Sequence, residues 1–291
     1  MTDMRSYRSP DFLGIGFRRC ASSWLHACLT EHPEIGKPPS GLHFFSKEEN
    51  YRKGIGWYEE QLSKYSDRRI LGEFSVSYTY PHVYERVAAR IHRHYPQAKI
   101  ICMVRNPVER AYSDYLRSVS RSELDKNVSF EKAIELDSDF IARGSYGQIL
   151  ESYFRCFSDA QLLVMFYGDL KANPGQFIRR VYDFLNVDQH YVPSLLTQNR
   201  GHAYSPKSQR VGRATRMTQR FFSRLLRGAR LGFILDQMKA WGIQDAVLNL
   251  NRADPPTMRP DTRHRLQDLY HDDIELLSSL LGKNLSFWQE S

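Results

Sequence analysis

The sequence has no apolar run of about 18 residues, the length a helix needs to cross a bilayer, and no segment built like a secretory signal peptide. We therefore expect no membrane-spanning helix and a cytoplasmic location. Cysteine is also scarce. The four cysteines, at positions 20, 28, 102 and 156, have neither metal-ligand nor disulfide-framework spacing. We expect reduced thiols in a reducing compartment, and no bound metal.

Acidic residues are missing from residues 189–235, in a chain whose formal net charge is +8. Within this stretch arginines recur every three or four residues, the spacing of one helical face, with phenylalanine and leucine between them. Three interpretations stay open for residues 210–230: a solvated helix, a surface that gathers an anionic or glycan ligand, or a peripheral helix on an anionic membrane that presents a lipid-linked ligand. Because no groove-reading motif accompanies the arginines, we expect no nucleic-acid partner.

The order of apolar strands and amphipathic helices predicts an α/β fold. Continuous apolar runs indicate buried strands at residues 12–17, 69–74, 99–104 and 161–167. The predicted helices are residues 23–32, 54–65, 81–95, 129–137, 146–157, 174–186 and 261–281. A further helix is predicted to begin at Pro107, and a polar segment at residues 118–128 follows it. Strands that alternate with helices favour a three-layer architecture, with a mainly parallel central sheet and helices on both faces. We expect one domain over residues 1–291, with a basic helical insertion at about 205–255.

Residues 11–26 predict an anion-binding strand–loop–helix. The segment DFLGIGFRRCASSWLH begins as a buried strand, turns through small and cationic residues, and enters a helix at Ser22 or Ser23. Free amides at a helix start, two hydroxyls and the Arg19 guanidinium together suit a phosphate. The alternative is an ordinary strand–helix turn with a serine cap. A nucleotide triphosphatase loop is disfavoured, because Ala21 stands where its second glycine would be and Ser22 where its lysine would be.

Other polar residues follow the ends of neighbouring predicted strands. Arg105 comes directly after residues 99–104, so its guanidinium suits a second phosphate, or else an ion pair with Glu109 or Asp114. Glu73, at the end of another strand, suits a general base, or else is a solvated carboxylate. His43 precedes two phenylalanines in a Gly- and Pro-rich loop and is a candidate assistant. Ligands of parallel sheets bind beyond the carboxyl ends of the strands, so we expect these groups at one edge.

Several motifs resemble those of the PAPS-dependent sulfotransferases, in that family's order, over roughly residues 10–205. Residues 17–24, FRRCASSW, resemble its 5′-phosphosulfate loop, where Lys or Arg, any residue and Gly precede two Thr or Ser residues. Residues 104–113, VRNPVERAYS, resemble its 3′-phosphate motif. Shorter segments resemble motifs of the family's heparan-type and bacterial branch: residues 72–78 (GEFSVSY), 42–45 (LHFF) and 143–146 (RGSY). Residues 199–201 (NRG) resemble the family's late basic-Gly loop.

The resemblance implies a P-loop NTPase-like fold and an enzyme that moves a sulfuryl group from PAPS to a hydroxyl or amine, with no metal required. It implies a carbohydrate, glycolipid or small metabolite as acceptor. Glu73 would be the base, Arg19 would stabilise the bridging oxygen, and His43 would assist. Trp24 would stack on the adenine. The implied nucleotide-binding residues are Arg19, Cys20, Ala21, Ser22, Ser23, Trp24, Arg105, Ser113, Tyr146, Arg200 and Gly201.

Three residues depart from the family's pattern. Arg19 replaces the lysine of many members and keeps a fixed charge. Ala21 replaces glycine, which we expect to be tolerated only at negative φ. Phe74 stands where the heparan-type branch has lysine, which argues against a heparan-like acceptor. Two other functions were weighed: a P-loop small-molecule kinase, which needs the missing lysine, and a non-enzymatic membrane- or polyanion-binding module, which leaves Glu73 and Arg105 without a role.

Overall fold

The computed structural model describes residues 7–36, 41–196, 205–206, 252–253 and 257–289. The chain divides into two compact units. The first comprises residues 1–110, 141–199 and 264–291, and the second comprises residues 111–140 and 200–263. Most of the predicted basic insertion lies outside the described residues. The expectation of one domain with such an insertion therefore stays a prediction.

The first unit is built on a four-stranded sheet of order β2-β1-β3-β4, in which all neighbours are parallel. The register pairs Phe12 of β1 with Gly72 of β2 and with Lys99 of β3. Parallel strands bring their carboxyl ends to one edge of the sheet, as the sequence predicted. The strands are β1 (Phe12–Gly16), β2 (Gly72–Phe74), β3 (Lys99–Val104) and β4 (Leu162–Phe166).

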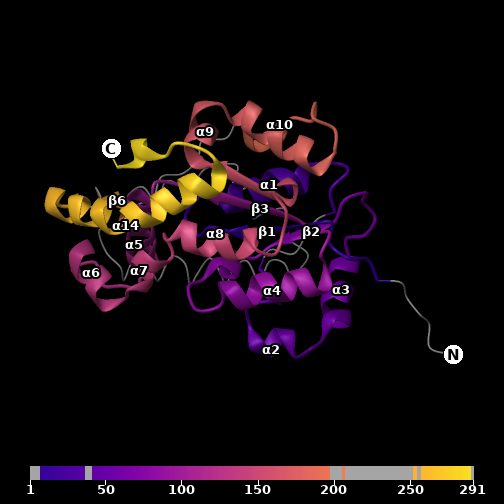
Figure 1. Cartoon of the computed structure of the whole chain (residues 1–291), viewed down its shortest axis with the longest axis horizontal. Coiled ribbons are helices and arrows are strands. Elements are labelled where there is room, and N and C mark those ends of the chain that lie inside the picture. The colour runs from indigo at the N-terminus through magenta and orange to yellow at the C-terminus, as the bar shows by residue number, and fades with distance from the viewer. Residues whose placement is uncertain (1–6, 37–40, 197–204, 207–251, 254–256, 290–291) are drawn as a thin grey trace. The chain divides into compact units, whose positions relative to one another are not determined.

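Helices cover both faces of this sheet (Figure 1). On one face lie α1 (Ser22–Glu31) and α10 (Pro174–Leu185), where Trp24 contacts Phe177 edge to face at 6.2 Å. On the other face α4 (Tyr84–His94) packs against α8 (Tyr146–Phe154). The three-layer α/β class is confirmed.

The remaining elements connect these layers. The first unit also contains α2 (Glu48–Tyr51), α3 (Ile55–Ser63), η1 (Val76–Thr79), η2 (Asp159–Gln161), α9 (Tyr167–Ala172), η3 (Ser194–Leu196) and η4 (Ser286–Trp288). The second unit contains α6 (Phe130–Leu136), β5 (Ser205–Pro206) and β6 (Arg252–Ala253). Three helices belong partly to each unit: α5 (Pro107–Arg121), α7 (Asp139–Ala142) and α14 (Pro260–Leu281).

The predicted boundaries differ from the observed ones at several elements, among them β2, α5 and α9. β2 begins at Gly72 rather than at residue 69, because Arg69 faces a polar network instead of a strand partner. α5 continues to Arg121, into the polar segment predicted at residues 118–128. The short helix α9 was not expected, and it begins at Tyr167, which was assigned to the preceding strand.

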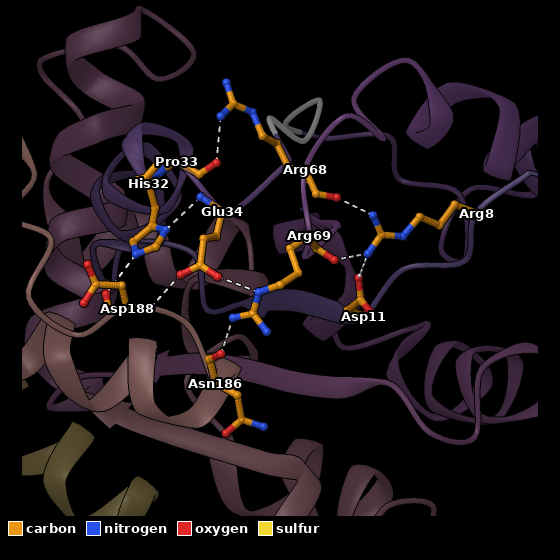
Figure 2. Close-up of polar contacts among 9 residues, drawn as sticks. All are labelled: Arg8, Asp11, His32, Pro33, Glu34, Arg68, Arg69, Asn186 and Asp188. Atoms are coloured by element: carbon orange, nitrogen blue, oxygen red, sulfur yellow. Dashed lines mark hydrogen bonds and ion pairs between the residues drawn. The ribbon is translucent and has the colours of Figure 1, made fainter.

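That polar network lies at the amino-terminal edge of the sheet (Figure 2). Arg69 pairs with the Glu34 carboxylate and also donates to the carbonyl oxygen of Asn186. Glu34 accepts from the Asp188 amide at 2.8 Å, and His32 contacts the Asp188 carbonyl oxygen at 2.9 Å. The network joins the end of α10 to the segments before β2, at the edge opposite the predicted phosphate loop.

Candidate active site

The predicted phosphate loop leaves β1 at Gly16 and enters α1 at Ser22. Within it, Arg19 and Ala21 have φ of 71° and 67°. The expectation of a negative φ at Ala21 is therefore wrong. The loop keeps the left-handed backbone that glycine favours, and the alanine methyl carries a steric cost of about 1 kcal/mol there. The backbone turn that the family builds with glycine is thus retained, with the first-turn amides of α1 at this edge.

A cavity of about 130 Å³ adjoins this loop. Ser22 is buried and donates to the Phe17 carbonyl oxygen at 3.4 Å, whereas Ser23 is exposed. The residues that line the cavity are Ser22, Ser23, His26, Gly41, His43, Phe74 and Val76. The structure therefore brings the two predicted phosphate-binding serines next to His43.

Several cationic residues act electrostatically on the buried Cys20 thiol. This thiol is fully buried and lies 3.5 Å from the Tyr146 hydroxyl. Burial raises the pKa of Cys20, and the positive charges of Arg110, Arg105 and Arg19 oppose that rise. Arg19 and Arg105 therefore act electrostatically on the same thiol. Arg19 follows β1 and Arg105 follows β3, and these parallel strands are neighbours in the sheet, so both residues stand at its carboxyl-terminal edge.

Arg105 opens onto a second cavity, of about 270 Å³. Its guanidinium pairs with Glu109 at 3.4 Å, as the alternative interpretation expected, and lies 5.1 Å from the centre of the Tyr167 ring. Lys171 lies over the same ring, and Lys283 lies over the Phe166 ring at 4.0 Å. The other lining residues are Asn106, Gly168, Asp169, Phe287 and Trp288. An aromatic wall with three cations suits a planar, anionic ligand.

Glu73 lies behind the cavity that His43 lines. Its carboxylate is fully buried and accepts hydrogen bonds from the hydroxyls of Tyr78, of Ser75 at 3.0 Å and of Tyr58 at 3.5 Å. Burial raises the pKa of Glu73 to about 7, against the lowering effect of the hydrogen bonds from Tyr78, Ser75, Leu42 and Tyr58. Glu73 is absent from the residues that line the 130 Å³ cavity. Its role as a base stays a prediction.

His43 lines that cavity directly. Its Nδ1 lies 2.6 Å from the Ser77 hydroxyl, which in turn contacts the Ser46 hydroxyl at 2.6 Å. A Cβ placed on Gly41 would lie 2.9 Å from Nε2 of His43. Burial lowers the pKa of His43, with Lys47 adding to the effect. The imidazole is therefore held through one nitrogen, and at neutral pH it is mainly uncharged.

Among the residues that the structure describes, no group of three or more histidine, cysteine, aspartate or glutamate side chains is arranged to hold a metal ion. No helix within the described ranges combines the length and hydropathy needed to cross a membrane.

Comparison with known families decides what kind of protein carries this geometry. The family model described as "Sulfotransferase domain" matches residues 9–223, which include the loop, both strand-end sites and the cavity that His43 lines. This chain belongs to the sulfotransferase domain family. The family expected from the motifs is therefore confirmed.

Relatives of this sulfotransferase-family chain include heparan sulfate enzymes. It is 28% identical over 225 residues to mouse heparan sulfate glucosamine 3-O-sulfotransferase 3A1, covering 73% of this chain and 55% of that protein. It is 30% identical over 195 residues to human heparan sulfate glucosamine 3-O-sulfotransferase 6, covering 63% and 56%. The chain thus spans little more than half the length of these relatives.

A solved structure confirms the sulfotransferase fold. A sulfotransferase from Alicyclobacillus acidocaldarius superposes with a TM-score of 0.67 at 22% identity, covering 97% of this chain and 99% of that one. The likeness extends over nearly the whole of both chains. The P-loop-like α/β fold predicted for this chain is confirmed.

Not every predicted nucleotide-binding residue of this sulfotransferase-family chain can be placed in the site. Arg200 and Gly201 lie outside the described residues. Ser113 lies on α5 within the second unit, so its pairing with Arg105 stays a prediction. Trp24 is half-buried against Phe177, and its stacking on adenine stays a prediction.

Several residues of this candidate site were not predicted from the sequence. Lys171, Lys283 and Trp288 line the Arg105 cavity, but the last two are far from it in sequence. Tyr58 and Tyr78 enclose Glu73. Tyr78 is the last residue of the GEFSVSY motif, and this position is the signal that could have identified it. Nothing in the sequence around Tyr58 singles it out.

Proposed function

We propose that this protein is a PAPS-dependent sulfotransferase that modifies a hydroxyl or amine of a carbohydrate, glycolipid or small metabolite. One observation carries the proposal: Arg19 follows β1 and Arg105 follows the neighbouring parallel strand β3, so two cationic residues stand at the same edge of the sheet. A nucleotide phosphorylated at its 5′ and 3′ ends needs two such cationic groups within its own length.

The residues present fit that nucleotide. Arg19, Ser22 and Ser23 would hold the 5′-phosphosulfate end, since they combine a fixed cation with hydroxyls at a helix start. Arg105 would hold the 3′-phosphate, with Lys171 and Lys283 beside it. When bound, PAPS supplies the sulfuryl group, which passes to the acceptor oxygen or nitrogen while adenosine 3′,5′-bisphosphate leaves and the acceptor gives up a proton. Positioning and cationic stabilisation favour such a transfer.

The predicted base for the acceptor's proton is Glu73, and we propose that His43 assists it. His43 lines the cavity beside Ser22 and Ser23, whereas Glu73 is fully buried. Because burial lowers the pKa of His43, its imidazole is uncharged at neutral pH and able to accept a proton. Donation of Nδ1–H to the Ser77 hydroxyl would leave Nε2 free for that proton.

A glycan is the acceptor class that we favour. The curated relatives carry names of heparan sulfate sulfotransferases, which act on a carbohydrate. The Phe74 side chain stands where the heparan-type branch has lysine, and a Cβ on Gly14 would lie 2.0 Å from its ring, so the phenylalanine is packed into the sheet. The acceptor we propose is therefore a carbohydrate other than heparan sulfate.

Calorimetric titration with adenosine 3′,5′-bisphosphate tests the nucleotide site. We expect binding that is the same with and without magnesium. Arg105→Ala should weaken it about 10- to 100-fold, the effect of losing a charge-assisted contact worth roughly 1.5–3 kcal/mol. Binding of AMP should change less than about threefold, because AMP has no 3′-phosphate.

Arg155→Ala is the matched control, because Arg155, directly after α8, is exposed and pairs with Glu151. It should leave both affinities unchanged. Equal losses for the two nucleotides in Arg105→Ala would contradict a 3′-phosphate role. Absence of binding by the unaltered protein would remove the proposed function.

A further inference from the structure

A third cavity, of about 460 Å³, lies at the amino-terminal edge of the sheet, opposite the edge that carries the phosphate loop. It is enclosed by the residues that lead into β1, β2 and β3 and by the end of α10, all of which belong to the first unit. Small-molecule sites commonly have volumes of about 300–1,000 Å³, and the two cavities at the other edge are smaller than that. This third cavity is therefore large enough for a ligand of its own.

Two cationic side chains of this cavity converge on the end of α10. Lys99, the first residue of β3, donates from its ammonium to the Phe184 carbonyl oxygen. Arg69, which precedes β2, donates from Nη2 to the Asn186 carbonyl oxygen (Figure 2). Cations are favourable at the carboxyl end of a helix, which accounts for one donor of each side chain. Because both reach the same helix end, both line one cavity.

Each of these two cations keeps hydrogen-bond donors that the fold does not use. Arg69 donates from Nε to Glu34 and from Nη2 to Asn186, and its Nη1 has no acceptor within the described part of the chain. The Lys99 ammonium carries three N–H donors, and among the residues that the structure describes it donates to the Phe184 carbonyl oxygen alone. Arg69 and Lys99 can therefore both donate to the oxygens of a ligand.

The charged groups that line the cavity leave one positive charge unpaired among the described residues. The Asp11 carboxylate pairs with Arg8 at 3.0 Å, and the Arg69 guanidinium pairs with Glu34. No carboxylate in the described ranges pairs with Lys99, whose ammonium otherwise lies 5.3 Å from the centre of the Phe184 ring. Burial lowers the pKa of His94, so its imidazole adds no charge at neutral pH. The remaining charge, that of Lys99, favours an anionic ligand.

Apolar groups form another part of the lining, which we call the apolar wall: Ile70, Pro96, Leu185 and the Tyr95 ring. The Tyr95 hydroxyl already donates to Glu59 at 3.0 Å, so it has no proton left to donate to a ligand. Such a wall favours the hydrocarbon part of a molecule. The cavity thus combines a cationic corner with apolar surface.

We propose that this cavity is a second ligand site, which binds a small organic anion. Arg69 and Lys99 hold its carboxylate or phosphate group, and the apolar wall contacts its hydrocarbon body. The site is distinct from the proposed nucleotide site, because the amino and carboxyl ends of parallel strands lie at opposite edges of the sheet. None of its residues is assigned to nucleotide or acceptor, so the inference does not depend on the proposed function.

Titration followed by amide NMR locates the site on the whole chain without nucleotide. Benzoate and phenyl phosphate are probes that share a ring and differ in the acidic group, and benzamide is the uncharged counterpart. We expect saturable shifts of the Ile70 and Lys99 amides with one or both anions, and at least about tenfold weaker binding of benzamide. The tighter anion identifies the acidic group. Shifts confined to the phosphate loop at residues 17–23, or no saturable shift with either anion, would overturn the proposal.

Two variants test the cationic corner. Lys99→Met keeps an unbranched side chain but removes the charge, and it should weaken binding of the anion about tenfold. In Gln97→Glu the new charge opposes the anion and should weaken binding about threefold. Gln97 is exposed, lines the cavity and makes no side-chain hydrogen bond within the described ranges, so this variant should fold normally.

Lys64→Met is the matched control, because it loses the same charge at an exposed residue outside the cavity. It should leave the Kd of the anion unchanged. Unchanged affinity in both Lys99→Met and Gln97→Glu would overturn the proposal. If Lys99→Met does not fold, the affinity of Gln97→Glu alone decides, and no change there would overturn it.

Discussion

Glu73 shows how one buried charge can serve a site at the expense of stability. Its carboxyl lies on β2 with no exposed surface, and its partners are hydroxyls and a backbone amide. Such groups stabilise an ionised carboxylate less than a cation does, so burial dominates and raises its pKa to about 7. The fold is therefore most stable when this carboxyl is protonated, whereas the predicted base must be ionised to accept a proton.

The raised pKa of Glu73 makes the free energy of unfolding depend on pH in a predictable direction. Because the pKa of Glu73 in the fold, about 7, lies above its ordinary 4.5, the folded protein binds the proton more tightly than the unfolded chain does. The contribution of Glu73 to the free energy of unfolding is full below about pH 4.5 and is lost as pH rises to about 7. At about 1.4 kcal/mol for each pH unit, the loss is on the order of 3 kcal/mol.

Glu73→Gln should remove this dependence, because glutamine stays neutral. We expect the free energy of unfolding of the variant, relative to the unaltered protein, to rise between pH 5 and pH 8 by up to about 3 kcal/mol. Denaturant titrations at both pH values measure it, with Glu59→Gln as control. The same pH dependence in the variant and in the unaltered protein would show that Glu73 does not titrate as described.

The phosphate loop and α1 act as one element, in which backbone conformation matters more than side-chain identity. Ala21 adopts the left-handed conformation directly before the helix, at a position where the family's pattern has glycine. Ala21 thus keeps the left-handed backbone that the loop requires, although a residue with a side chain disfavours that conformation.

Ala21→Gly should relieve this strain and raise the free energy of unfolding by up to about 1 kcal/mol, less the entropy that glycine adds to the unfolded chain. Ala89→Gly, on the exposed face of α4, is the matched control and should lower it by about 1 kcal/mol. Thermal and denaturant unfolding measure both. Destabilisation by both substitutions would show that Ala21 carries no strain.

At the scale of the whole chain, distant segments complete the Arg105 cavity. Trp288 and Lys283, near the C-terminus, line it, and the Trp288 carbonyl oxygen accepts from the Asn106 side chain at 2.9 Å. Asp273 of α14 accepts from the Gly147 and Gln148 amides at the start of α8. The last part of the chain thus holds both a helix start and the mouth of a predicted nucleotide site.

The net charge of +8 and the arginine-rich residues 210–230 are also properties of the whole chain that bear on what it binds. If that segment lies on an anionic membrane, changing Arg220, Arg224 and Arg227 to Ser should weaken binding to phosphatidylserine vesicles about 100-fold, at about 1 kcal/mol per arginine. Vesicle co-sedimentation measures this. The control with the same loss of charge changes the exposed Arg52, Arg86 and Arg93. Absence of vesicle binding by the unaltered protein would remove the membrane interpretation.

Local patterns were enough to predict most of the architecture. The buried strand at residues 99–104 reads as an unbroken apolar run, and it is β3 (Lys99–Val104) in the structure. Pro107 begins α5 as expected, because its missing N–H costs nothing at a helix start. The predicted start of β2 is wrong because of a tertiary contact: Arg69 pairs with Glu34, which is 35 residues away in the sequence.

The sequence by itself determined the family, the order of strands and helices, and the two cationic strand ends, since each depends on neighbouring residues or on ordered motifs. Tertiary structure alone decided which side chains meet. Burial of Glu73 depends on Tyr58, fifteen residues away, and the nearness of His43 to Ser22 depends on parallel strand pairing. A carboxylate at a strand end looks the same in sequence whether it faces a ligand or lies under a tyrosine, because desolvation is a property of the whole packed neighbourhood.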